Sequence, residues 1–215
     1  MKQATEAYIA SFFERRTDLQ FLQKSVLDAV QMLIHAFHNG NKLLLCGNGG
    51  SCADCEHIAG ELLKGFLLKR PVKQELIDEL TRRYGEQGRE IGEKLQQGLP
   101  AISLGTHAAA ISAFANDVDP SLVYAQQVLA YGRQGDILLG ISTSGNAENV
   151  SAAMMTAKSL GLHTIALTGR DGGKLARLAE ISLIMPQQET YRIQEDHLAV
   201  YHLLCAAVEY ELFNR

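Results

Sequence analysis

The chain has 215 residues, of which 47% are hydrophobic and 20% are charged, and its formal net charge is −4. This is the composition of a globular protein that is long enough to bury a substantial core. A slightly acidic chain without a run of Lys or Arg offers no electrostatic basis for binding nucleic acid or an anionic membrane surface, so we expect neither as a partner.

The cysteines and the apolar runs predict the compartment. Cys46, Cys52, Cys55 and Cys205 fit a reducing environment in which thiols stay free. No apolar run approaches the ~20 residues that span a bilayer, and the N-terminus lacks the apolar block of a signal peptide. We therefore expect a cytoplasmic protein. Cys52 and Cys55 form a C-x-x-C pattern, but the chain has no second one, which argues against a zinc or redox role.

In chain order, a helical pattern over residues 5–39 comes first and stops at Asn39-Gly40. Five short β-type runs follow, with helical stretches between them. They are Lys42–Cys46, Pro100–Leu104, Asp136–Ser142, His163–Thr168 and Ile181–Met185. The segment Thr190–Phe213 has no Gly or Pro and predicts one long helix. Apolar strands between amphipathic helices indicate a parallel sheet covered on both faces. We predict a single α/β domain over residues 1–215, a three-layer α/β/α fold with a five-stranded parallel sheet and long terminal helices.

Residues 72–97 do not fit this alternation. Their apolar residues form two stripes, Leu76-Leu80-Tyr84 and Ile91-Leu95. Gly85, Gly88 and Gly92 weaken the middle of any helix there. We interpret the segment as an excursion of one or two helices from the sheet edge that packs on a partner subunit or caps the site, and a solvated surface helix fits equally well.

Two predicted strands end in loops suited to a phosphorylated ligand, because ligands bind at the carboxyl ends of parallel strands. The third run is followed by Ser142, Thr143, Ser144 and Gly145, and a helix is expected from about Ala147. Free backbone N–H groups and hydroxyls at a helix N-terminus favour an anion, whereas a simple cap needs only one such residue. The first run is followed by a second loop, Gly47–Ser51, rich in glycine.

Candidate chemical groups lie on two predicted helices. His57 and Glu61 are four residues apart and share a helix face, where they could bind a metal together or act as acid and base. Most isolated pairs of this kind are surface hydrogen bonds. The last helix carries Gln194, His197 and His202, and spacing alone neither chooses between the two histidines nor gives Gln194 a role.

Several segments together resemble the phosphoheptose isomerases, a family of sugar isomerase (SIS) domain proteins. They are Cys46–Ser51, His57-x-x-x-Glu61, Asn116-Asp117, Gly140–Asn146, Leu167–Gly169 and Arg192–Glu195. The resemblance covers most of the chain outside residues 72–97 and the first dozen residues. It implies a cytoplasmic SIS-domain homotetramer. The implied reaction is interconversion of sedoheptulose 7-phosphate and D-glycero-D-manno-heptose 7-phosphate through an enediol, the first step towards ADP-heptose.

The resemblance also implies residue roles. Glu61 and His202 match the acid/base pair, and Glu61 suits the base. The implied phosphate ligands are Ser142, Thr143 and Ser144. The other implied substrate contacts are Asn48, Gly49, Gly50, Ser51, Glu61, Asn116, Asp117 and Gln194. The zinc site of some family members corresponds to His57, Glu61, Gln194 and His202.

Three positions depart from the family pattern near the sugar-phosphate end. Ala147 replaces a serine, Gly60 replaces the first of two glutamates, and Gly65 replaces an arginine for which Lys64 or Lys69 would have to substitute. We therefore expect weaker or shifted phosphate binding, and the substrate itself could differ.

Two non-enzymatic classes are the alternatives. One is an SIS regulator that associates with a replication initiator, and the other is a sugar-phosphate sensor. The regulator type does not keep both acid/base residues at the positions of His57–Glu61 and His202, whereas this chain has all three. An enzyme is therefore favoured.

Overall fold

A computed structural model describes residues 1–214 as a five-stranded, fully parallel sheet with the strand order β2-β1-β3-β4-β5. Each of the five predicted strands is confirmed to within one residue at either end. The strands are β1 (Leu43–Gly47), β2 (Ala101–Ser103), β3 (Ile137–Ser142), β4 (His163–Gly169) and β5 (Ile181–Met185). The register sets Gly47 opposite Ile141 and Ser142 opposite Thr168, so the ends of β1, β3 and β4 lie side by side.

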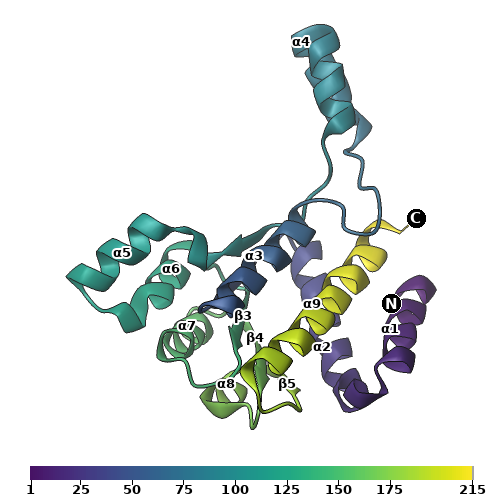
Figure 1. Cartoon of the computed structure of the whole chain (residues 1–215). Coiled ribbons are helices and arrows are strands. Elements are labelled where there is room, and N and C mark those ends of the chain that lie inside the picture. The colour runs from purple at the N-terminus through teal and green to yellow at the C-terminus, as the bar shows by residue number, and fades with distance from the viewer. Residues whose placement is uncertain (215) are drawn as a thin grey trace.

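Helices cover both faces of the sheet, which confirms the three-layer prediction (Figure 1). One face carries α1 (Gln3–Arg15), α2 (Gln23–His38), α3 (Gly50–Leu63) and α9 (Thr190–Phe213). The other carries α5 (Ala108–Asp117), α6 (Val123–Tyr131), α7 (Glu148–Ser159) and α8 (Gly173–Leu178). Successive β1 residues alternate between the two cores, since Leu43 and Leu45 belong to the first and Leu44 and Cys46 to the second. None of the helices in residues 1–214 has the length and apolar character needed to cross a membrane.

The continuous helix predicted over residues 5–39 is wrong in one respect. The chain leaves the helical conformation at Arg16 (φ −117°, ψ 62°) and continues as a short 3-10 helix, Thr17–Leu22, before α2. The Arg16 guanidinium bonds to Asp18 at 2.7 Å and to Asp196 of α9 at 2.6 Å. The turn lets α1 fold back and pack along α9.

Residues 74–94 form a helical hairpin, α4 (Gln74–Lys94), which reverses direction at Gly85 (φ 62°, ψ −142°). Only glycine adopts this conformation without strain. Gly88 and Gly92 are buried against the opposite arm, and a methyl carbon on Gly88 would lie 2.0 Å from the Leu80 carbonyl oxygen. The predicted weak point in the middle of the segment is confirmed at Gly85, where the helix is interrupted. Gly88 and Gly92 have a further role, because they let the two arms pack closely.

The hairpin α4 projects away from the rest of the molecule (Figure 1). Its apolar residues Leu76, Tyr84, Ile91 and Leu95 are exposed. Within one chain it therefore does not cap the loops at the strand ends. Packing on a partner subunit stays a prediction.

A buried ion pair ties the base of the hairpin to α9. Arg70 Nε lies 2.7 Å from Glu209 Oε1, and both side chains are 0% exposed. Glu209 also accepts hydrogen bonds from the backbone N–H groups of residues 66–68. Arg70 donates to the Leu62 carbonyl at 2.8 Å and to the Glu61 carbonyl at 3.4 Å, which fixes the last turn of α3.

Candidate active site

The two glycine- and hydroxyl-containing loops meet between β1 and β3. These strands are neighbours, but α3 leaves β1 towards one face of the sheet and α7 leaves β3 towards the other. Such a switch point opens a crevice at the carboxyl ends of the strands, where α/β proteins bind ligands.

A cavity of about 110 Å³ occupies this crevice. Its lining residues come from both loops: Asn48, Ser51, Ile141, Ser142, Thr143 and Ala147. Asn48 is held by a reciprocal amide pair with Asn149 of α7, with hydrogen bonds of 2.8 and 2.9 Å. Asn149 was not predicted as a site residue. In the sequence it is distinguished only by being an amide side chain in the first turn of the helix that follows the hydroxyl loop.

The hydroxyl loop leads into the N-terminus of α7. Ser144 Oγ accepts a hydrogen bond from the Asn146 N–H at 3.2 Å, which closes a tight turn. Ala147 is the N-cap residue and has no side-chain oxygen with which to cap the helix. The first N–H groups of α7 therefore lie beside the cavity with the hydroxyls of Ser142 and Thr143.

Helix α9 reaches the glycine loop through Gln194. A methyl carbon on Gly50 would lie 2.3 Å from Gln194 Nε2, so the amide can approach only because residue 50 is glycine. The structure thus gives Gln194 a place beside Gly50, which sequence spacing could not do.

A second group of polar side chains lies further along α3 and α9. His57 Nε2 is 3.3 Å from Glu61 Oε1 and 3.3 Å from His202 Nε2. The predicted shared face of His57 and Glu61 is confirmed, and His202 is the histidine that faces them. Burial lowers the pKa of His202, the nearby His57 lowers it further, and Glu61 opposes the shift. His202 therefore favours the neutral imidazole in the free protein.

His197 does not face these groups and instead stabilises the packing of α9 on the sheet. It is fully buried, and its Nε2 lies 3.1 Å from the Thr168 carbonyl oxygen at the end of β4. Burial lowers its pKa from 6.5 to about 4, so the ring is neutral and donates to that carbonyl. The Gly169 N–H in turn donates to the Thr143 carbonyl. His197 thereby connects α9 with the strand that supports the hydroxyl loop.

Two buried or half-buried residues that the sequence analysis did not consider hold His57. The Tyr201 hydroxyl lies 3.0 Å from His57 Nδ1 and donates to Asp54 Oδ1 at 3.3 Å. Burial raises the pKa of the Asp54 carboxyl, and the hydrogen bond from Tyr201 and the nearby His57 oppose this shift. Burial likewise raises the pKa of Tyr201, so its hydroxyl keeps its proton.

Asn116 and Asp117 stand apart from the groups described above. They lie at the C-terminal end of α5, are exposed, and bond to each other at 2.9 Å from Asn116 Nδ2 to Asp117 Oδ1. The structure of one chain does not bring them to the cavity, and their expected contact with the sugar stays a prediction.

The sequence of this chain is similar to those of known proteins. A model of the SIS domain matches residues 7–95 and 93–169. A phosphoheptose isomerase of Helicobacter pylori strain P12 is 40% identical over 194 residues, which covers 90% of this chain and 88% of that relative. The enzyme of Clostridium acetobutylicum is 36% identical over 218 aligned positions, which cover 100% and 97% of the two chains. The chain belongs to the phosphoheptose isomerase family.

Solved structures agree with this assignment. A phosphoheptose isomerase from Neisseria gonorrhoeae matches with a TM-score of 0.72 at 33% identity, covering 96% of this chain and 97% of that one. A putative sugar-phosphate isomerase from Listeria monocytogenes shares the fold alone, at 14% identity and a TM-score of 0.56.

One departure from the phosphoheptose isomerase pattern has a counterpart in the structure. Lys64 Nζ lies 2.9 Å from Glu61 Oε2, so this lysine places a positive charge beside the carboxylate. Lys69 instead lines a different cavity at the base of the hairpin. Of the two lysines considered as substitutes for the missing arginine, Lys64 is therefore the one at the site.

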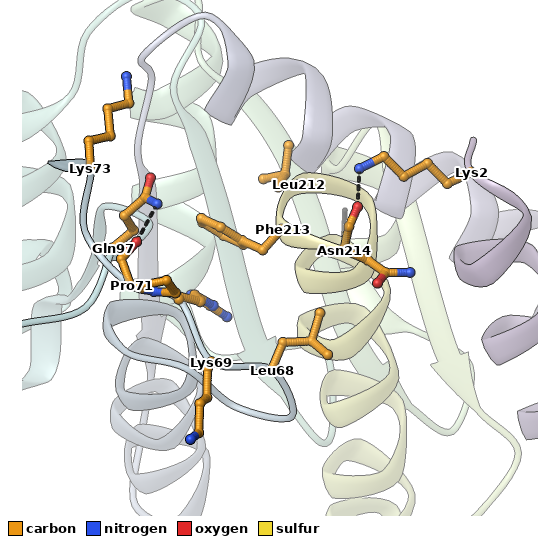
Figure 2. Close-up of a pocket in the computed structure, with 10 residues that line it drawn as sticks. Lys2, Leu68, Lys69, Pro71, Lys73, Gln97, Leu212, Phe213 and Asn214 are labelled. Carbon is orange, nitrogen blue, oxygen red and sulfur yellow. Dashed lines mark hydrogen bonds between the residues drawn. The ribbon is translucent and has the colours of Figure 1, made fainter.

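That other cavity has a volume of about 690 Å³. Figure 2 shows the Lys69 and Lys73 side chains pointing in opposite directions around Leu68 and Phe213. Positive charge does not converge there. The smaller crevice, with its helix N-terminus and hydroxyls, is the better candidate for a member of this family.

Cys52 and Cys55 both lie on α3, and neither forms a disulfide with another cysteine. Across residues 1–214, no three His, Cys, Asp or Glu side chains form a group arranged to hold a metal ion. Zinc binding accordingly stays a prediction.

Proposed function

We propose that this protein is a phosphoheptose isomerase that interconverts sedoheptulose 7-phosphate and D-glycero-D-manno-heptose 7-phosphate. The observation that carries the proposal is a pair of 3.3 Å contacts made by His57. One joins His57 to Glu61 on α3, the helix that follows the glycine loop, and the other joins His57 to His202 on α9. The relatives named above are phosphoheptose isomerases at 36% and 40% identity over most of the chain, which supports the same activity.

The phosphate would be held by the hydroxyl loop. Ser142, Thr143 and Ser144 supply hydroxyl donors, and the N-terminus of α7 supplies backbone N–H groups and the positive end of a helix dipole. Asn48, Gly49, Gly50 and Ser51 would contact the sugar chain from the other loop, together with Gln194. Asn116 and Asp117 would join them if a neighbouring subunit or a closed state brings them near.

Glu61 is proposed as the base. It would take the proton from C1 of the ketose while the electron pair of that C–H bond forms the C1–C2 double bond and the carbonyl oxygen at C2 gains a proton from His202. The product of this step is the 1,2-enediol. Return of a proton to C2 and loss of the proton on O1 then give the aldehyde at C1. Lys64 forms an ion pair with this carboxylate, with 2.9 Å between Lys64 Nζ and Glu61 Oε2.

Zinc is a proposed cofactor. The donor types fit, because imidazole nitrogen and carboxylate oxygen are zinc ligands, and a tetrahedral ion with bonds of about 2.0–2.1 Å has neighbouring ligands roughly 3.3 Å apart. Two pairs of these donors, His57–Glu61 and His57–His202, lie at that spacing of 3.3 Å, although within residues 1–214 no three of them are arranged around one point in the free protein. His57, Glu61, Gln194 and His202 would hold the ion. When bound, it would polarise the substrate carbonyl as a Lewis acid.

Further parts of the proposal concern the assembly and its location. We propose one domain over residues 1–215 that assembles into a tetramer, supported by exposed apolar side chains on several helices, including Phe21 at 60% and Met155 at 52% exposure. A cytoplasmic location is supported by the four free cysteines. Light scattering on a sizing column tests the tetramer.

The main test is an NMR assay of the purified protein with sedoheptulose 7-phosphate, with and without added zinc. Appearance of the aldoheptose 7-phosphate supports the isomerase, and a dependence on zinc supports the metal role. Saturable binding without turnover would instead indicate a sensor, a regulator or a different substrate.

A further inference from the structure

Two residues that are neither proposed metal ligands nor the proposed acid or base, Tyr201 and Asp54, lie on the Nδ1 side of the His57 ring. The Tyr201 hydroxyl lies 3.0 Å from His57 Nδ1 and 3.3 Å from Asp54 Oδ1. Tyr201 belongs to α9, whereas Asp54 and His57 are one turn apart on α3. The hydroxyl therefore joins the two helices on which the site is built.

Burial makes these hydrogen bonds hard to replace. Tyr201 is 1% exposed, so water does not compete freely for its hydroxyl. The second Asp54 oxygen, Oδ2, is buried and has no hydrogen-bond partner within residues 1–214. Asp54 therefore depends on Tyr201 for a donor, because a buried carboxylate oxygen without one is costly.

The chemistry of the three groups fixes the directions of the hydrogen bonds. An ionised carboxylate only accepts, so the single Tyr201 proton points to Asp54 Oδ1. The Tyr201 oxygen then accepts, and the group facing it on His57 must be Nδ1–H. When Nδ1 holds the only ring proton, the lone pair is on Nε2, the atom that lies 3.3 Å from both Glu61 and His202. A carboxylate at Glu61 favours a proton on that nitrogen instead, so the Tyr201–Asp54 pair opposes Glu61 in setting the tautomer.

We propose that Tyr201 and Asp54 are positioning residues that hold His57 as the Nδ1–H tautomer, with the Nε2 lone pair directed at Glu61 and His202. This inference deepens the proposed function and rests on it for its catalytic meaning. A lone pair at that point is what a metal ion needs from a histidine ligand, and partners on the other ring nitrogen fix the orientation of such ligands.

The test uses Tyr201→Phe, which removes one hydroxyl and keeps the buried ring. Tyr8→Phe is the matched control, since the ring of Tyr8 on α1 packs against Tyr210 of α9 with 5.1 Å between the centroids. Long-range ¹H–¹⁵N spectra of histidine-labelled protein near pH 8 report the tautomer of His57, which a His57→Asn spectrum assigns. Calorimetric titration with zinc alone reports metal affinity without any turnover.

We expect wild-type protein and Tyr8→Phe to show the Nδ1–H form of His57. Tyr201→Phe should show a mixture of tautomers, about tenfold weaker zinc binding and a similar loss in kcat/KM. Asp54→Asn should shift His57 in the same direction, because the amide no longer demands the Tyr201 proton.

The inference is overturned if wild-type His57 carries its proton on Nε2, or if Tyr201→Phe keeps both the Nδ1–H form and a zinc affinity within twofold of wild type. An unchanged tautomer in Asp54→Asn alone would remove Asp54 from the pair. The spectra do not depend on turnover. Failure to convert the heptose phosphate with the expected tautomer pattern intact would therefore contradict the proposed activity and leave this inference standing.

Discussion

The two ends of the candidate site are built in different ways. The proposed phosphate end is the loop of residues 142–147, which brings backbone N–H groups and small hydroxyl side chains to a cavity of about 110 Å³ that Asn48 and Ser51 also line. The chemical end uses single side chains from α3 and α9, and its His57 and His202 are 145 positions apart in the chain. At the phosphate end several hydrogen-bond donors would hold one ligand, whereas at the chemical end each proposed role belongs to a single side chain.

The chemical end also depends on buried support that the phosphate end does not need. Arg70 and Glu209 fix the last turn of α3, where Glu61 lies. His197 fixes α9 to the end of β4. Single changes should therefore have large effects at the chemical end and its supports, and graded effects at the phosphate end.

The largest effect is expected from Glu61→Gln. Loss of the base should lower kcat by about 10²–10⁴-fold, with KM and the melting temperature little changed, because only the ionisable oxygen is lost. Steady-state kinetics with sedoheptulose 7-phosphate measure this. Glu56→Gln, an exposed change on the same helix, is the control. Wild-type activity in the Glu61 variant would refute the assigned base.

Arg70→Met tests the support of α3. It leaves the Glu209 carboxylate buried without its charged partner, so the free energy of unfolding should fall by about 3–5 kcal/mol. Urea denaturation followed by circular dichroism measures the change. Arg89→Met, in the exposed ion pairs of the hairpin, should alter the midpoint little. Equal effects of the two variants would contradict the distinction between buried support and surface charge.

His197 predicts how stability depends on pH. Its pKa is about 4 in the folded protein and near 6.5 when unfolded, so the unfolded state binds the extra proton between these values. His197 does not lower the free energy of unfolding above about pH 6.5. As the pH drops to 4, protonation of this residue in the unfolded state lowers the free energy of unfolding by roughly 3 kcal/mol. His197→Gln should remove that part of the slope in urea titrations from pH 7 to pH 4, and His38→Gln, at the surface, should not.

Thr143→Val probes the phosphate end. Removing one of several donors should raise KM by about tenfold and leave kcat unchanged, since a hydrogen bond to a charged group contributes about 1.5 kcal/mol. Thr156→Val is the control, because that hydroxyl bonds to the Ala152 carbonyl within α7. A loss of kcat as large as that of Glu61→Gln would show that the two ends do not differ.

The smallest effect is expected from Ala147→Ser, which places at the N-cap of α7 the serine that the resemblance leads us to expect there. The hydroxyl should cap the helix and raise stability by about 0.5–1 kcal/mol. It should also lower KM roughly two- to fivefold by adding a phosphate donor. Thermal melts and kinetics measure both quantities, and an increase in KM would show that the cavity is adapted to a different ligand.

The same contrast separates what the sequence predicted from what it could not. Strands and the hydroxyl loop follow from runs of adjacent residues, and both are confirmed in position. Arg16, where the first helix breaks, pairs with Asp18 nearby and also with Asp196, which lies 180 positions away and cannot be linked to it from a local pattern. The choice of His202 over His197 depends on which side of α9 meets α3 and which meets β4. The roles of Tyr201 and Asp54 were not predicted either, because their contact also depends on how α9 packs on α3.

The hairpin gives the chain an engineering property. Pro71 and Gln96 are paired across its base, and the Gln97 N–H donates to the Arg70 carbonyl at 2.7 Å, so the excursion leaves and re-enters the domain at one point. A segment with adjacent ends can be lengthened, shortened or exchanged without redirecting the host chain. The tip near Gly85 is accordingly a natural place to splice in a fluorescent reporter or an affinity tag.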